Sequence, residues 1–131
     1  MDFEELISQN TPFTIIYMDL DNLKKVNDAY GHSVGDEYLK QFTKATIETV
    51  GNKGNLYRMS GDEFVCIYRE VRIDLFFSTF NGKISNRFAM NIPFLGVSIG
   101  YSKFPEDGDS LDKLIKKADT KMYSVKNNQS E

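Results

Sequence analysis

The sequence is poor in the features that mark secreted and membrane-spanning chains. Its only cysteine, Cys66, lies in an apolar run and cannot form an internal disulfide, which favours a reducing, cytoplasmic setting. No apolar stretch approaches the roughly 18 residues of a transmembrane helix, and residues 1–12 lack the basic and then apolar form of a signal peptide. We therefore expect a cytoplasmic chain with no membrane segment, although a longer parent protein could be membrane-anchored.

An excess of positive charge is also missing. The net charge of −3 at pH 7 gives no general attraction to nucleic acid polymers or to anionic membranes, so any phosphate ligand needs a local site. The 131 residues, 40% of them hydrophobic and ten of them Phe, are enough to bury one core. With no repeat, low-complexity tract or linker, residues 1–131 are expected to form a single domain.

The hydrophobic pattern predicts alternating strands and helices. An apolar, β-prone run follows Pro12 and stops abruptly at Asp19, as a buried strand does. Small and acidic residues at 60–63 predict a tight hairpin. In order, the predicted elements are a strand over 13–18, a helix over 23–30, a longer helix up to residue 50, strands over 56–59 and 64–68, a helix over 73–89 that Asn81-Gly82 interrupts, a strand over 94–101 and a helix over 111–125.

This β-α-β-β-α-β-α order predicts an α+β fold of the ferredoxin-like kind, with an antiparallel central sheet and helices on one face. In that arrangement the third strand lies between the first two and runs antiparallel to the first. The end of the first strand, at Asp19, then lies beside the start of the third, at Asp62 and Glu63. Carboxylates about forty residues apart in sequence would meet at one edge of the sheet.

Such an acidic cluster predicts a cation site. Asp19, Asp21, Asp62 and Glu63 repel one another unless a cation or protons neutralise them. Carboxylate oxygens with room for substrate phosphates suit Mg²⁺ or Mn²⁺, and two metals could align an attacking hydroxyl with a leaving pyrophosphate.

Two other interpretations of these acids need no such metal. Asp21 and Asn22 could cap the following helix while Asp62 forms the turn, and for an isolated Asp-x-Asp this is the commoner outcome. A calcium-binding EF-hand loop is excluded, because Leu23 and Lys24 occupy the positions that require an oxygen ligand and a glycine.

Four segments, in order, resemble the GGDEF domain of bacterial diguanylate cyclases. The first is similar to the family's D-[LI]-D-x-F-K-x-x-N-D-x-x-G-H-x-x-G-D run, and the second to its R-x-G-G-[DE]-E-F signature. The matching stretches are Asp19 to Asp36, Arg58 to Phe64, Val97 to Gly100 with Pro105, Asp107 and Gly108, and Lys117 to Lys126. The resemblance implies the nucleotidyl-cyclase palm form of the ferredoxin-like fold.

The resemblance implies roles for the acidic cluster. Asp19, the backbone carbonyl of Leu20, and Asp62 would hold the Mg²⁺ (or Mn²⁺) that accompanies the GTP phosphates. Glu63 would be the second acidic group of the signature, assisting deprotonation of the 3′-hydroxyl or holding a second metal, so that Asp62 and Glu63 are the catalytic pair. Asp21 is a further metal candidate.

It also implies how the nucleotide is bound. Asn27 and Asp36 would recognise the guanine edge, because a carboxylate can accept hydrogen bonds from its ring N–H and exocyclic amine. Outside this context Asn27, like its neighbour Asp28, could be an ordinary exposed helix residue.

The phosphates would be held near the start of the first helix. The backbone N–H groups of Asn22 and Leu23 would cradle them there, and Lys24 and Lys126 would add positive charge. Without a phosphate-binding role, Lys24 could be an ordinary solvated lysine, and Lys126 could provide a favourable charge at a helix C-terminus.

Four departures from the family pattern bear on activity. Ser60 replaces the first signature Gly, with a cost on the order of 1 kcal/mol if that position needs a positive φ. The family's N-terminal leading segment is absent, and no sensor domain is expected within the chain. Ser130 stands where a phosphate-binding Arg is expected. Residues 51–54 replace the Arg-x-x-Asp of the inhibitory product site, so no such site is expected.

The resemblance implies a bacterial diguanylate cyclase that condenses two GTP molecules into cyclic di-GMP at the interface of two GGDEF domains. The expected partners are GTP, a second domain in a transient homodimer, and other domains of a longer protein. The alternatives are a weak or inactive domain that binds GTP and regulates a partner, and an interaction domain that no longer binds nucleotide.

Overall fold

The computed structural model describes residues 3–88 and 93–129. The predicted order of strands and helices is confirmed, with one short helix before it. The elements are α1 (Phe3–Ser8), β1 (Phe13–Leu20), α2 (Leu23–Tyr30), α3 (His32–Val50), the 3-10 turn η1 (Gly51–Lys53), β2 (Gly54–Ser60), β3 (Glu63–Tyr68), α4 (Ile73–Arg87), β4 (Val97–Phe104) and α5 (Leu111–Gln129). Among these residues, no helix combines the length and apolar character needed to cross a bilayer.

The four strands form one antiparallel sheet in the order β2-β3-β1-β4. The third strand therefore lies between the first two, as the sequence predicts. β1 is central and its eight residues are all buried, which explains why its sequence is a nearly continuous apolar run rather than an alternating one. β2 is an edge strand, and most of its side chains are exposed.

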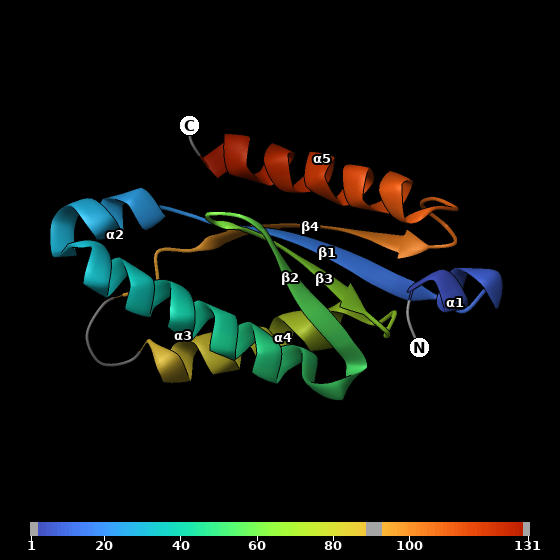
Figure 1. Ribbon diagram of the computed structural model, residues 1–131, viewed down its shortest axis with the longest axis horizontal. Helices are drawn as coiled ribbons and strands as arrows, with labels where there is room; N and C mark the ends of the chain where they lie inside the picture. The colour runs from blue at the N-terminus through green and yellow to red at the C-terminus, as the bar shows by residue number, and fades with distance from the viewer. Residues whose placement is uncertain (1–2, 89–92, 130–131) are drawn as a thin grey trace.

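Helices cover both faces of the sheet, so the prediction of helices on one face was wrong. α3 and α4 lie on one side and α5 lies on the other (Figure 1). Alternate residues of β1 serve the two cores, because successive side chains of a strand point to opposite faces. Ile16 and Met18 pack in the α3/α4 core, and Ile15 and Tyr17 in the α5 core. The strand therefore buries both faces, which requires a second helical layer.

The last strand begins three residues later than predicted, at Val97 instead of residue 94. Phe94 is an aromatic core residue instead, since its ring stacks on that of Tyr38 with centroids 5.9 Å apart. Gly96, with φ +106°, ends this connection. β4 then alternates between half-buried and buried residues through Phe104.

The helix after β3 is continuous through the predicted interruption at Asn81-Gly82. Phe76, Phe80 and Ile84 keep a four-residue spacing and are all buried, so core packing outweighs the roughly 1 kcal/mol cost of a helical Gly. The helix ends at Arg87, and the predicted end at residue 89 lies outside the described residues.

Candidate active site

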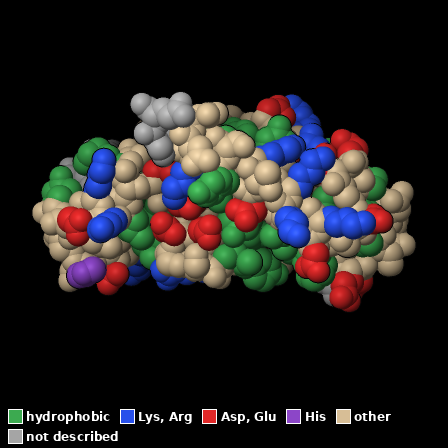
Figure 2. All heavy atoms as spheres, turned by 90° about the horizontal axis from the view of Figure 1, so that it is seen from above, with side chains coloured by type: hydrophobic (Ala, Val, Ile, Leu, Met, Phe, Trp, Pro, Cys, Tyr) green, Lys and Arg blue, Asp and Glu red, His purple; other side chains and the backbone are tan. Residues whose placement is uncertain are grey.

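The candidate site lies where β1 ends beside the β2–β3 hairpin. Asp19 is directly opposite Glu63 in the antiparallel register, and the backbone N–H of Leu20 donates to the carbonyl of Asp62 at 2.8 Å. The predicted meeting of these acids at one sheet edge is therefore confirmed. Figure 2 shows acidic side chains near the middle of the face that carries α5, with Lys and Arg side chains on both sides.

Asp19 is a buried carboxylate, only 6% exposed. Its Oδ2 lies 2.9 Å from Nζ of Lys126 in the last turns of α5. Its Oδ1 is buried and has no hydrogen-bond partner. Burial raises the pKa of Asp19 most, the hydrogen bond from Lys126 opposes that rise, and the negative charges of Asp62 and Glu63 add to it. The net pKa of Asp19 is raised, so the site favours a cation or a proton beside it.

Lys126 experiences the opposite combination of effects. Burial is the largest single influence on its pKa and lowers it. The hydrogen bond with Asp19 and the negative charges of Asp19, Asp62 and Asp21 together outweigh that influence, and the net pKa is raised. The ammonium group is therefore charged and held at the mouth of the acidic cluster.

Two hydroxyl groups that sequence reasoning did not identify lie close to Glu63. Ser60 Oγ donates to its Oε2 at 3.1 Å. The phenol of Tyr17 lies near Glu63, and burial, together with the charges of Glu63, Asp119 and Asp19, raises the pKa of this phenol to about 12. The Ser60 hydroxyl therefore donates to the Glu63 carboxylate, and the protonated Tyr17 phenol lies near it.

Ser60 replaces the first signature Gly without the cost of a positive φ. It is the last residue of β2, and it is not among the described positions with positive φ. The hairpin that follows is fixed by Arg58, whose guanidinium donates to the carbonyl of Gly61 at 2.7 Å.

Asp21 is directed toward β4. Its Oδ1 accepts from Ser98 Oγ at 2.9 Å, and its backbone N–H donates to the carbonyl of Gly96 at 3.0 Å. A Cβ at Gly96 would lie 3.3 Å from Oδ2 of Asp21. Asp21 therefore joins the end of β1 to the start of β4, a role that accounts for the Ser in the late Val-Ser-Ile-Gly segment.

The start of α2 is open to an anion. Asn22 occupies the N-cap position in the left-handed region, with φ 63° and ψ 21°, and makes no side-chain capping bond. Its side-chain amide donates to the carbonyl of Leu95 instead. The alternative interpretation, in which Asp21 and Asn22 cap this helix, is therefore not supported, and the N-cap residue of α2 provides no side-chain cap. Lys24, one residue further on, is exposed.

Asn27 and Asp36 come from adjacent helices. The Asn27 carboxamide lies against the backbone of Gly35, since a Cβ at Gly35 would be 1.6 Å from Asn27 Oδ1. Gly35 is buried in the first turn of α3 and is followed by the exposed Asp36. The missing side chain at Gly35 is thus what lets Asn27 lie beside the residue predicted to share its ligand.

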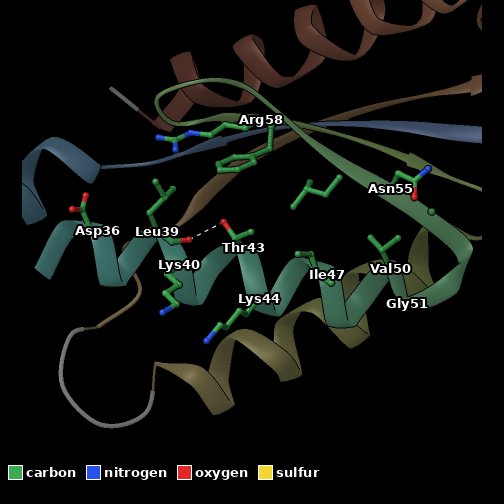
Figure 3. Close-up of a pocket in the computed structure, with 13 residues that line it drawn as sticks. Asp36, Leu39, Lys40, Thr43, Lys44, Ile47, Val50, Gly51, Asn55 and Arg58 are labelled. Carbon is green, nitrogen blue, oxygen red and sulfur yellow. Dashed lines mark hydrogen bonds between the residues drawn. The ribbon is translucent and has the colours of Figure 1, made fainter. Parts of the chain in front are cut away.

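A groove of about 870 Å³ begins at Asp36 and runs along α3 beneath β2. Figure 3 shows Asp36 and Arg58 toward one end and Asn55 and Gly51 at the other. Its lining includes Leu39 but none of the four clustered acids. The groove therefore meets the site on the side of the predicted base-binding residues, and the acidic cluster lies outside it.

The residues present fit a divalent cation that arrives with a nucleotide. Within residues 3–88 and 93–129, no three His, Cys, Asp or Glu side chains form a ready metal cage. Mg²⁺ does not require one, since it is commonly held by one or two carboxylates together with substrate phosphates and water. The unpartnered buried Oδ1 of Asp19 is an acceptor of the kind such an ion would use.

Comparison with known proteins identifies the family and agrees with the fold. Over residues 2–131 the sequence matches the family described as diguanylate cyclase, GGDEF domain. The chain belongs to the GGDEF family. The family takes part in bacterial cyclic di-GMP signalling, and the proteins similar to this GGDEF domain include both cyclases and a phosphodiesterase.

Two curated relatives illustrate this range. The GGDEF domain is 34% identical over 119 residues to the diguanylate cyclase DgcM of Escherichia coli K12, covering 88% of this chain and 28% of DgcM. It is 32% identical over 124 residues to the cyclic di-GMP phosphodiesterase PdeR of the same strain, covering 91% of this chain and 19% of PdeR. The chain thus spans less than a third of the length of either relative.

Solved structures agree with the fold of this GGDEF domain. The active GGEEF domain of a diguanylate cyclase from Vibrio cholerae gives a TM-score of 0.77 at 25% identity, over 96% of this chain and 83% of that one. The GGDEF domain of DgcB from Caulobacter crescentus, in complex with cyclic di-GMP, gives 0.73 at 21% identity, over 95% and 78% respectively. At that identity the second likeness shows the fold alone.

Ser130, which stands where the family pattern has a phosphate-binding Arg, lies outside the described residues.

Proposed function

We propose that this domain is a diguanylate cyclase that condenses two GTP molecules into cyclic di-GMP and releases two pyrophosphates. The observation that carries the proposal is the pairing of Asp19 with Glu63 across β1 and β3, with a buried Asp19 oxygen left unpartnered. A scaffold would have no reason to keep a buried acceptor without a donor, because such a group costs about 1–3 kcal/mol.

Nucleotide binding would use both sides of the site. Asn27 and Asp36 would hold the guanine edge, the uncapped start of α2 would hold phosphate, and Lys24 would add charge. Asp19, the Leu20 carbonyl and Asp62 would hold Mg²⁺ or Mn²⁺, with Asp21 remaining a weaker candidate because one of its oxygens is bonded to Ser98. When bound, the cation would offset the negative charge of the triphosphate.

The reaction would require two domains facing each other, since each binds one GTP. The 3′-hydroxyl of one nucleotide would attack the α-phosphate of the other, forming a new O–P bond as the bond to pyrophosphate breaks. Glu63 would help to remove the proton of that hydroxyl. The remaining contribution of the protein would be positioning and electrostatic stabilisation.

A second candidate function is a weak or inactive domain that binds GTP and regulates other domains of a longer protein. The hydroxyl of Ser60 favours it, because it donates to Glu63 Oε2 and so occupies an oxygen that would otherwise accept the substrate proton.

Product formation separates these functions. The purified chain at high concentration is incubated with GTP and Mg²⁺ or Mn²⁺, and cyclic di-GMP is measured by mass spectrometry. Asp62→Ala should abolish the product, while Asp112→Ala, which removes an exposed acid from α5, should leave it unchanged. Saturable GTP binding without product would support the regulator, and absence of both would contradict both functions.

A further inference from the structure

The ion pair between Lys126 and Asp19 joins two groups to which the resemblance to the GGDEF family gives different parts of the ligand. Asp19 would hold the metal, and Lys126 would add positive charge near the phosphates. In the structure their atoms Oδ2 and Nζ are 2.9 Å apart, with the Asp19 side chain 8% exposed and the Lys126 side chain 36% exposed. The ammonium group therefore lies on one oxygen of the carboxylate that is expected to hold the cation.

The other oxygen of Asp19 supplies an independent observation. Asp19 Oδ1 is buried and unpartnered, so only the other carboxylate oxygen has a positively charged group beside it. A buried carboxylate with no cation beside it is unfavourable, and a single ammonium offsets part of that cost. The described residues contain no ready three-ligand metal cage, so a divalent ion that binds alone at Asp19 would either displace the Lys126 ammonium group or lie beside it.

We propose that Lys126 is a built-in counter-ion, which holds the cation position at Asp19 in the nucleotide-free domain and transfers to phosphate when the metal arrives with a triphosphate. The proposal rests on the proposed function for the nucleotide and for the metal at Asp19. Its consequence is that the divalent ion binds poorly by itself, because it competes with the ammonium group for Asp19 and is repelled by that positive charge.

With a triphosphate present, the same displacement is favourable, since the ammonium exchanges one anion for another. Metal and nucleotide then bind cooperatively, and by linkage each raises the affinity of the other by the same factor. Lys126 would thereby determine that the site accepts a metal–nucleotide complex rather than a free cation.

The test compares Lys126→Met with Lys117→Met, a matched control on the same helix. Lys117 also pairs with an aspartate, since its Nζ lies 2.8 Å from Oδ1 of Asp107, and its side chain is 45% exposed. Binding of Mn²⁺ is followed by the electron paramagnetic resonance signal of the free ion, first alone and then with 3′-deoxy-GTP, which lacks the attacking hydroxyl.

K126M should bind Mn²⁺ alone about ten-fold more tightly than the wild type, and Mn²⁺ with 3′-deoxy-GTP about ten-fold more weakly. K117M should match the wild type in both measurements. Lys126→Arg, which keeps the charge, should retain weak binding of Mn²⁺ alone. Equal or weaker Mn²⁺ affinity in K126M would overturn the proposal, as would the same tightening in K117M.

The two proposals fail separately. If the wild type does not bind 3′-deoxy-GTP with metal, the proposed function fails, while the measurement with Mn²⁺ alone still tests Lys126. If K126M does not fold, the ammonium resonance of Lys126 in the wild-type domain decides. It should persist with Mg²⁺ alone and shift only when nucleotide is added, and a shift with Mg²⁺ alone would contradict the counter-ion role.

Discussion

Substituting Gly35 by Ala should weaken GTP binding without weakening the fold. A Cβ at this position would lie 1.6 Å from Oδ1 of Asn27 and 2.8 Å from its Cγ. The obstructing atoms belong to the end of a side chain, so the Asn27 carboxamide can rotate away at little cost to packing. Ala is also a better helix former than Gly by about 0.5–1 kcal/mol, so the free energy of unfolding should stay equal or rise.

The expected loss is that of one hydrogen bond between the Asn27 amide and the guanine edge. Such a bond between neutral groups contributes about 0.5–1.5 kcal/mol, which corresponds to an affinity about 2- to 12-fold weaker. Isothermal titration calorimetry with 3′-deoxy-GTP and Mg²⁺ measures this loss directly. Chemical denaturation of the same samples checks the fold.

A double-mutant cycle tests whether Gly35 acts through Asn27. In an Asn27→Ala background the G35A substitution should have no further effect, because the side chain that it displaces is already gone. Unchanged affinity in G35A would refute the reasoning. So would an equal loss when G35A is added to N27A, since Gly35 would then act on the ligand directly.

Three other substitutions have definite expected outcomes. Gly100→Ala should lower the free energy of unfolding by about 1–3 kcal/mol, measured in urea, because its Cβ would lie 2.2 Å from backbone atoms of α5; an unchanged midpoint would contradict that close approach. Asp19→Asn should stabilise the metal-free domain increasingly as pH rises from 4.5 to 7.5. The pKa of Asp19 is raised by burial, so its contribution to stability is lost as pH rises through that pKa, and a pH-independent difference would count against it. Ser60→Gly should lower kcat about five-fold at unchanged KM, because the loss of its hydrogen bond to Glu63 removes about 1 kcal/mol of positioning of that carboxylate; a faster enzyme would favour the regulatory function.

The parts of the fold that depend on local pattern were predictable from sequence. The strand that ends at Asp19 and the hairpin after Ser60 follow from an apolar run and from turn residues. Their juxtaposition followed from the order of elements, because that order restricts the ways in which the sheet can be connected.

The second helical layer was harder to predict, since a run of consecutive apolar residues in one strand indicates burial on both faces but does not say what covers them. The start of β4 was misplaced for a related reason. The sequence is equally compatible with Phe94 in a strand and with Phe94 in a connection that places its ring in the core. Only its packing on Tyr38 distinguishes these possibilities.

Some site residues could likewise be predicted from the sequence, and others could not. Asp19, Asp62 and Glu63 stand out because acidic groups at strand ends and turns are conspicuous in a sequence. The contacts of Tyr17 and Ser98 could not be predicted, since they depend on which face of a strand a hydroxyl occupies and on the register between strands. The ion pair of Lys126 joins residues more than a hundred positions apart, and it requires the position of α5 across the sheet.

The dependence of rate on protein concentration tests the central claim most directly. Pyrophosphate release from GTP and Mg²⁺ is measured over a hundred-fold range of domain concentration, with Asp62→Ala as the blank. Because each domain would bind one GTP and two must meet, specific activity should rise in proportion to concentration until the dimer saturates. Specific activity that stays constant over the whole range, or product from the D62A protein, would contradict the account.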